Sequence, residues 1–150
     1  MSFLITQAAR ADIAVCMKIN EASMPETYSP QFWTLHLNQF GDMFFVAKVD
    51  GQVMGYVLCR IEIVNNIRTG LIISVAVDKD YRGLGIGEEL MKRAHYAMRA
   101  KNIPMAGLQV RKSNVSAIAM YNKMGYAANL SIPGYYKNPV EDGWLMTLVL

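Results

Sequence analysis

A segment with glycine at every second position constrains this chain more than any other part of its sequence. It follows the apolar run Val75–Val77, covers Gly83–Gly87, and leads into an amphipathic segment that begins at Ile86. Glycine lets the backbone approach a ligand closely, and the free N–H groups and positive dipole end of a helix N-terminus attract anions. The pattern therefore predicts a strand, a phosphate-binding loop and a helix, with Arg82 as a cation at the mouth of the loop.

Two other phosphate-binding motifs do not fit this segment. The Rossmann fingerprint requires a third glycine three residues after the second, and Glu88 stands there. No acidic residue ends the following apolar run, Ala106–Val110, to bind a ribose. The Gly-Lys-Ser/Thr ending of nucleotide-binding P-loops is absent as well. A glycine-rich turn that only packs a helix against a strand is the alternative interpretation.

The rest of the chain alternates between strand and helix patterns. Asp50-Gly51, between the apolar runs Phe44–Val49 and Gln52–Ile63, predicts a hairpin, because a type I′ turn needs positive φ at both central residues. The nearly apolar run Leu71–Val77 predicts a central strand with a parallel crossover to the next one. The predicted order is β-α-α-β-β-β-α-β-α-β-β. We therefore expect an α/β fold in a single domain, 1–150, with a mixed sheet and helices on both faces.

Some element boundaries are also predicted. Ser29-Pro30 predicts the start of the second helix, with serine as the N-cap and proline in the first turn. Asp12 is the expected N-cap of the first helix. Between the last two strands, Pro133–Tyr136 is expected to begin a turn-rich loop.

Composition excludes several classes of protein. The chain has 53% hydrophobic residues, too many for a disordered protein, and a net charge of +3, too mild to indicate nucleic-acid binding. Cys16 and Cys59 lie in apolar segments, so we expect buried reduced thiols in a cytoplasmic protein. We expect no secretion signal or membrane span, because the apolar runs are too short. His36 and His95 lack partners at ligand spacing, so no metal site is expected.

The glycine loop resembles the acetyl-CoA motif of the GNAT N-acetyltransferases. Arg82-Gly83-Leu84-Gly85-Ile86-Gly87 matches its Arg/Gln-x-x-Gly-x-Gly/Ala pattern. Further matching segments are Met24–Tyr28, Leu108–Asn114, Ala117, Met120-Tyr121, Met124–Tyr126, Gly134–Tyr136 and Glu141-Asp142. The set is most similar to protein N-terminal acetyltransferases, especially the ribosomal-protein-alanine enzymes and the archaeal relatives of the NatA catalytic subunit. It implies the GNAT fold and acetyl-CoA as the acetyl donor.

The resemblance implies which residues contact acetyl-CoA. The backbone of Val75, Ala76 and Val77 is expected to lie next to the pantetheine arm. The pyrophosphate is expected to be held by the amides of Arg82, Gly83, Leu84, Gly85, Ile86 and Gly87. The other two residues are Asn114 and Tyr121. Asn114 is either a helix cap or a pantetheine contact, and it can serve as both. Tyr121 occupies the family position that protonates the departing CoA thiolate, whereas core packing is the alternative interpretation of a tyrosine at helical spacing.

The general base is the point at which this chain departs from the family. Relatives have a glutamate or histidine where this chain has Gln109, and several have a histidine or tyrosine where it has Leu71. Neither side chain can accept a proton. Glu26 is the leading substitute, because the matching loop of the family faces the incoming amine, and Glu62 is the second candidate. A solvated surface charge is the alternative interpretation of each.

The same resemblance implies a groove for a peptide N-terminus, lined by Tyr28, Tyr135 and Tyr136 with Trp33 beneath. Packed aromatic side chains are the alternative interpretation. A peptide α-amine with a pKa of about 7.7–8.0 is roughly one-tenth neutral at pH 7, whereas a lysine amine is neutral to only about 0.04%. A site without a strong base therefore favours α-amines. We predict direct acetyl transfer from acetyl-CoA to the α-amino group of protein or peptide N-termini.

Two alternatives to this function stay open at this point. One is an acetyltransferase for a small, polyamine-like amine. The other is a non-catalytic acyl-CoA-binding regulatory module, which Gln109 and Leu71 suggest. The expected partner is a peptide N-terminus, without nucleic acid or membrane. An auxiliary subunit, association with the ribosome, and a monomeric or dimeric state are left undecided by the sequence.

Overall fold

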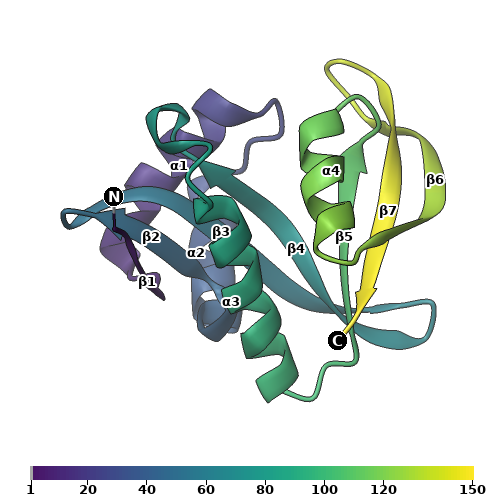
Figure 1. Cartoon of the computed structure of the whole chain (residues 1–150), viewed down its shortest axis with the longest axis horizontal. Coiled ribbons are helices and arrows are strands. Elements are labelled where there is room, and N and C mark those ends of the chain that lie inside the picture. Colours follow the sequence, from purple (N-terminus) through teal and green to yellow (C-terminus); the bar gives the residue numbers. More distant parts are fainter. Residues whose placement is uncertain (1) are drawn as a thin grey trace.

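The computed structural model describes residues 2–150 and contains seven strands and four α-helices (Figure 1). The strands are β1 (Leu4–Gln7), β2 (Phe45–Val49), β3 (Gln52–Val64), β4 (Ile67–Val77), β5 (Met105–Arg111), β6 (Ala127–Tyr136) and β7 (Glu141–Val149). The helices are α1 (Ile13–Ser23), α2 (Pro30–Phe40), α3 (Ile86–Ala100) and α4 (Val115–Lys123), with short 3₁₀ turns at Arg10–Asp12, Gly41–Met43 and Lys79–Tyr81.

All seven strands form one mixed sheet in the order β1-β2-β3-β4-β5-β7-β6, with β4 at its centre. The pair β4–β5 is parallel and is connected through α3, whereas the other pairs are antiparallel. The predicted α/β class, the order of the elements and the parallel crossover are therefore confirmed. No helix in the described residues is long and apolar enough to cross a membrane.

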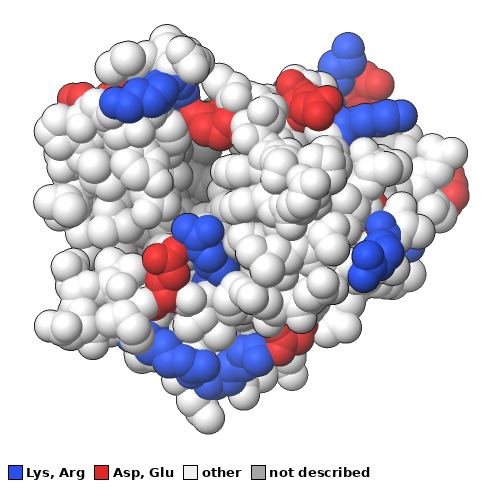
Figure 2. All heavy atoms as spheres, turned by 180° about the vertical axis from the view of Figure 1, so that it is seen from behind, with Lys and Arg blue, Asp and Glu red and all other residues white. Residues whose placement is uncertain are grey.

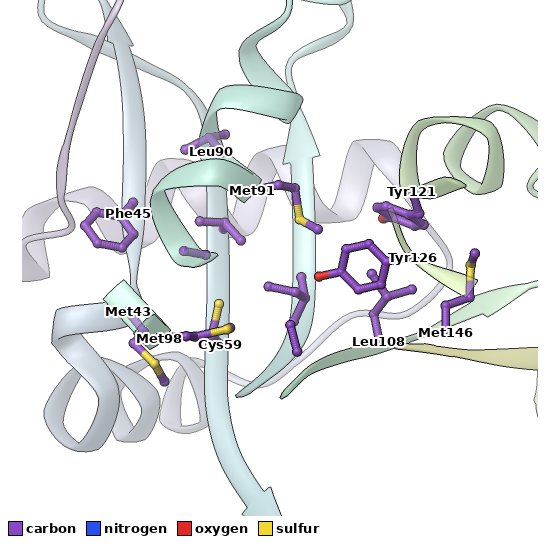
Figure 3. Close-up of a cluster of buried hydrophobic side chains, with 14 of the residues drawn as sticks. Met43, Phe45, Cys59, Leu90, Met91, Met98, Leu108, Tyr121, Tyr126 and Met146 are labelled. Carbon is purple, nitrogen blue, oxygen red and sulfur yellow. The ribbon is translucent and has the colours of Figure 1, made fainter. Parts of the chain in front are cut away.

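The two faces of the sheet carry separate hydrophobic cores because strand side chains alternate between the faces. In Figure 1, α3 and α4 lie in front of the sheet, and α1 and α2 lie behind it. The front core gathers Met91 and Met98 of α3 against Cys59 of β3, and Figure 3 shows it extending to Tyr121 at one end. The rear core surrounds Trp33 of α2, which is fully buried.

Local signals explain most of the element boundaries. Asp50 and Gly51 have φ of 50° and 79°, as the type I′ turn requires. The Ser29 hydroxyl accepts a hydrogen bond from the Phe32 N–H at 3.2 Å, which confirms the predicted cap of α2. Asp12, in contrast, does not cap α1 with its side chain, because its carboxylate accepts the Ala9 N–H in the preceding 3₁₀ turn.

The loop predicted to begin at Pro133–Tyr136 is instead the end of β6, and the turn lies after it, at residues 137–140. The β6–β7 register breaks between Ile132 and Tyr136, so these residues form an irregular stretch of an edge strand. An edge strand tolerates proline, whose missing N–H leaves no ladder bond broken. The Gly134 N–H donates to the Asp142 carboxylate at 2.8 Å, which ties the irregular stretch to the neighbouring strand.

The central strands β4 and β5 separate partway along the sheet. Their ladder runs from Thr69–Met105 to Ile72–Leu108 and ends there, although both strands continue. At this point the β3–β4 register shifts and leaves Ile73 without a partner, which is the mark of a β-bulge. Beyond the bulge β4 stays paired with β3 and β5 with β7, so the sheet divides into two halves (Figure 1).

A histidine of α3 is buried beside the start of β6. The Nε2 atom of His95 lies 2.6 Å from the hydroxyl of Tyr126, and the pair joins the helix to the sheet half that carries α4. Burial, and then the positive charge of Arg99, lower the pKa of His95 from 6.5 to about 4. The folded protein therefore holds His95 neutral over a pH range in which the unfolded chain binds a proton there.

We predict that the free energy of unfolding decreases as the pH is lowered from about 6.5 to 4, because the unfolded state takes up the additional proton. The loss from His95 reaches about 3 kcal/mol near pH 4. Thermal or urea unfolding measured across this range checks it, with His95→Gln as the variant that cannot titrate. The variant is expected to show a shallower slope whatever its stability at pH 7, and an unchanged slope contradicts the assignment.

Candidate active site

A cavity of about 1410 Å³ opens where β4 and β5 separate. Figure 2, a view onto the α1–α2 face, shows a hollow with acidic and basic side chains at its border. The cavity walls come from both faces of the sheet: the glycine loop and α4 on one side, the α1–α2 loop and the end of β6 on the other. An opening that passes between two strands gives two ligands separate entrances to a common centre.

The edge of β4 that faces the cavity has free backbone groups. The Asp78 N–H donates to the Met54 carbonyl of β3, and antiparallel pairing alternates from there, so Val77 and Val75 direct their N–H and C=O groups away from β3. Ala76 differs from the sequence prediction, because its carbonyl faces Gly55 of β3. Of the three residues predicted to pair with pantetheine, Val75 has both backbone groups available and Val77 has its N–H, because the Val77 carbonyl already accepts a hydrogen bond from the Arg82 side chain.

The glycine loop has the conformation expected of an anion-binding site. Gly83 and Gly85 have φ of +77° and +84°, in the left-handed region that favours glycine. A Cβ atom at either position meets nothing within 4 Å, so close packing of helix on strand is not the reason for these glycines. Gly85 is also the N-cap of α3 and no side chain caps the helix, so its first N–H groups are available to a ligand.

The remaining loop residues divide between the cavity and the outer surface. Arg82, Ile86 and Gly87 line the cavity, whereas the side chain of Leu84 is exposed on the β1 side of the loop. The Arg82 guanidinium donates from Nε to the Val77 carbonyl at 3.0 Å, and no carboxylate within residues 2–150 pairs with it. The loop therefore presents uncompensated positive charge toward the cavity.

Helix α4 closes the cavity on the opposite side. The Asn114 side-chain oxygen accepts the Ala117 N–H at 3.3 Å, which confirms Asn114 as the cap of α4, and the residue also lines the cavity. Tyr121 lines the cavity with only 8% of its surface exposed, and burial raises its pKa to about 12. Tyr121 is thus fully protonated at neutral pH and can donate a hydrogen bond into the cavity.

A partly buried arginine holds together the loops on the other side of the cavity. Arg111, at the end of β5, donates from Nε to Glu26 at 2.8 Å and from Nη1 to Glu141 at 3.1 Å. It also donates to the carbonyls of Pro139 and Lys137, and its side chain is only 11% exposed. The α1–α2 loop and the β6–β7 turn are therefore both fixed by one side chain.

Hydrogen bonding reinforces the position of each carboxylate in this network. The Asn20 amide donates to the Glu26 carbonyl at 3.0 Å, and the Ser113 N–H donates to the Glu141 carboxylate at 2.7 Å. Hydrogen bonding from Ser113, together with the Arg111 guanidinium, holds the pKa of Glu141 below its ordinary value. Two negative charges thus face one partly buried cation at the cavity wall.

The predicted peptide-groove tyrosines are brought together, and the predicted tryptophan is not among them. Tyr28, Tyr135 and Tyr136 line the cavity, and the guanidinium of Arg111 lies 4.6 Å from the Tyr136 ring centre. Burial raises the pKa of Tyr28 and of Tyr136. Trp33 is fully buried in the rear core because the apolar face of α2 packs on the sheet, so it supports Tyr28 edge-on rather than contacting a ligand.

The structure distinguishes the two candidate bases. Glu26 lies at the cavity wall with its Oε1 atom bound to Arg111. Glu62 lies at the rim and pairs with Arg60 of the same strand at 2.5 Å, more exposed than Glu26. Gln109 and Leu71 also line the cavity, so both departures from the family pattern are part of the site. Within residues 2–150, no cluster of three or more histidine, cysteine or acidic side chains is arranged to hold a metal ion.

Comparison with known proteins agrees with this geometry. Residues 13–126 match the Acetyltransferase (GNAT) family. The chain belongs to this family. It is 36% identical over 157 aligned positions to an N-alpha-acetyltransferase of Sulfurisphaera tokodaii, an alignment that covers 99% of this chain and 93% of that protein. The acetyl-CoA-dependent N-acetyltransferase predicted from the glycine loop is therefore confirmed at the level of the family.

Solved structures show the same fold. Ard1 from Thermoplasma volcanium has a TM-score of 0.90 and 25% identity, covering 100% of this chain and 99% of that one. A chain of a NatC complex bound to a Gag peptide and CoA has a TM-score of 0.90 at 24% identity, with the same coverage. The GNAT fold predicted from the sequence is thereby confirmed.

Arg111 and Ser23 are among the cavity-lining residues that the sequence did not single out. Arg111 lies within a segment that carried the family resemblance, but its role appears only from its contacts with loops 85 and 30 residues away. The sequence signal for Arg111 was its position as a charged residue at the end of a mostly apolar strand. Ser23, the last residue of α1, lines the cavity and gave no sequence signal of its own.

We predict that Arg111→Lys lowers kcat/KM for the peptide about 10- to 100-fold, because a lysine cannot hold both carboxylates and charge-assisted hydrogen bonds contribute about 1.5–3 kcal/mol each. The dissociation constant of CoA is expected to stay the same. Steady-state kinetics and calorimetric titration check this pair of outcomes. Lys112→Met, which removes the neighbouring cation outside the network, is the matched control, and an equal loss in both variants counts against the role of Arg111.

Proposed function

We propose that this chain transfers the acetyl group of acetyl-CoA to the α-amino group at the N-terminus of proteins, by direct attack of the amine on the thioester. One observation carries the proposal: a single cavity connects an open strand edge and an uncapped helix N-terminus with a second entrance beside Glu26. The N-alpha-acetyltransferase relatives support it. A cytoplasmic location fits the two buried free cysteines, Cys16 and Cys59.

The cofactor side fits acetyl-CoA in shape and charge. The open edge offers the N–H and C=O groups of Val75 and the N–H group of Val77, the kinds of partner that the amides of a pantetheine arm need. The loop amides from Gly83 onward and the N-terminus of α3 suit a diphosphate, and Arg82 adds positive charge. Asn114 lies across the cavity from this edge. These residues bind and orient the donor so that its thioester lies between β4 and Tyr121.

The amine side needs a group that accepts a proton. As the nitrogen lone pair forms a bond with the thioester carbon, the ammonium that results must lose one proton. We assign this step to Glu26, because it is the less exposed of the two candidate carboxylates that line the cavity and its Oε2 atom has no hydrogen-bond partner within the described residues. Arg111 holds the carboxylate through Oε1 and leaves Oε2 as the oxygen that can accept the proton.

Tyr121 is assigned to the leaving group. A phenol with a pKa of about 12 is a weaker acid than a thiol at about 8.5, so complete proton transfer alone is unfavourable by roughly 5 kcal/mol. Tyr121 therefore acts by donating a hydrogen bond to the sulfur as the C–S bond breaks and negative charge develops. The proton that neutralises the thiolate is supplied overall by the attacking amine, so that charge and protons balance over the reaction.

We predict thiol release from acetyl-CoA with peptides that have a free N-terminus, and much slower release with an N-terminally blocked peptide that carries one lysine. The physical reason is the much larger neutral fraction of the α-amine at pH 7. Peptides beginning with Ala, Ser, Met or Glu define the preference, and a polyamine provides the small-amine arm. Faster transfer to the lysine peptide or the polyamine contradicts the proposal.

We predict that Glu26→Gln lowers kcat about 100-fold at pH 7, within the range for loss of a general base, and that the loss persists above pH 9, because the proton that Glu26 accepts leaves the nitrogen only after the neutral amine has attacked. Glu62→Gln, which changes a rim carboxylate in the same way, is the matched control and is expected to retain most activity. Tyr121→Phe lowers kcat at every pH without weakening CoA binding. A larger loss for Glu62→Gln than for Glu26→Gln moves the base to Glu62.

A further inference from the structure

A contact between Arg82 and the end of α1 has no part in the mechanism described above. The Nη2 atom of Arg82 donates to the Ser23 hydroxyl oxygen at 3.1 Å, across 59 positions of sequence. Ser23 ends α1, and the next residues, Met24–Tyr28, form the loop that lines the peptide side of the cavity. One hydrogen bond thus joins the start of the glycine loop to the end of α1, directly before the loop Met24–Tyr28.

The geometry around Arg82 leaves part of the guanidinium free. Its Nε atom is bound to the Val77 carbonyl and its Nη2 atom to Ser23, while Nη1 has no partner within the described residues. Two fixed N–H groups hold the plane of the guanidinium, because its donors have a rigid fork geometry. The free donors then point to a set direction instead of sampling many side-chain conformations.

We propose that Ser23 is a positioning residue that fixes Arg82 for the diphosphate of CoA and thereby couples cofactor binding to the loop that carries Glu26. This inference rests on the proposed binding of the CoA diphosphate at the glycine loop. Fixing a flexible arginine in advance removes part of the entropy lost on binding. Because Ser23 precedes the Glu26 loop directly, any tightening of Arg82 on the diphosphate also restrains that loop.

The coupling has a thermodynamic consequence that can be measured. If the diphosphate restrains the peptide loop through Ser23, CoA must tighten the binding of a peptide, and the peptide must tighten the binding of CoA by the same factor. Donors without the diphosphate, such as pantetheine, reach the strand edge but not Arg82. The binding of such donors is therefore expected neither to depend on Ser23 nor to tighten the binding of a peptide.

The test measures the dissociation constants of CoA and of pantetheine by calorimetric titration of the full chain, with no amine present, so that binding is tested apart from acetyl transfer. Ser23→Ala is expected to weaken CoA about three- to fivefold, the equivalent of one typical net hydrogen bond, and to leave pantetheine unchanged. Ser23→Thr keeps the hydroxyl and is expected to restore CoA binding. Glu21→Ala, an exposed position in the same turn of α1, is the matched control.

Equal weakening of CoA and pantetheine indicates a merely structural role for Ser23 and overturns the proposal, as does unchanged CoA binding. Adding Ser23→Ala to Arg82→Gln is expected to cause no further loss, because the two act as one unit. With a saturating acetylated peptide, the wild type is expected to bind CoA more tightly than without it, and Ser23→Ala to lose this difference. Undetectable CoA binding to the wild type counts against the proposed function itself.

Discussion

The separation of β4 from β5 after Ile72 and Leu108 is the constraint on which the rest of the site depends. A continuous ladder would bury the backbone groups of Val75 and Val77 in hydrogen bonds and leave no passage through the sheet. A bulge at Ile73 in the pairing of β4 with β3 lies at the point where the β4–β5 ladder ends. A ligand that completes the interrupted ladder therefore replaces a missing strand, while the second substrate enters from the opposite face.

Much of the fold follows from local patterns in the sequence. The Asp50-Gly51 turn, the Ser29 cap and the glycine loop each have one conformation that their residues favour, and the structure shows it. Predictions failed where tertiary contacts decide. The Asp12 carboxylate accepts the Ala9 N–H in the preceding 3₁₀ turn and so does not cap α1. Residues Pro133–Tyr136 continue β6 because this strand pairs with β7 in spite of the irregular register. Both outcomes depend on neighbours that periodicity does not reveal.

The candidate site was predictable as a set of residue types but not as a network. The position of Tyr121 on the cavity wall agrees with the role that the sequence resemblance implies, whereas Trp33 is a core residue because α2 turns its apolar face inward. The contacts of Arg111 join segments far apart in the chain, so no spacing rule finds them. Its side chain shows how one partly buried cation can hold two loops together through charge-assisted hydrogen bonds.

The irregular edge of β6 has a consequence for the protein in a crowded solution. A free sheet edge normally offers a row of N–H and C=O groups to any passing extended chain, which is a route to fibrous aggregation. Here Pro133 lacks the N–H group, and the register breaks on both sides of Leu130–Ile132 disturb the spacing of the donors. At the other edge, β1 has only four residues. An enzyme that handles extended peptide ends thus resists pairing with them along its own borders.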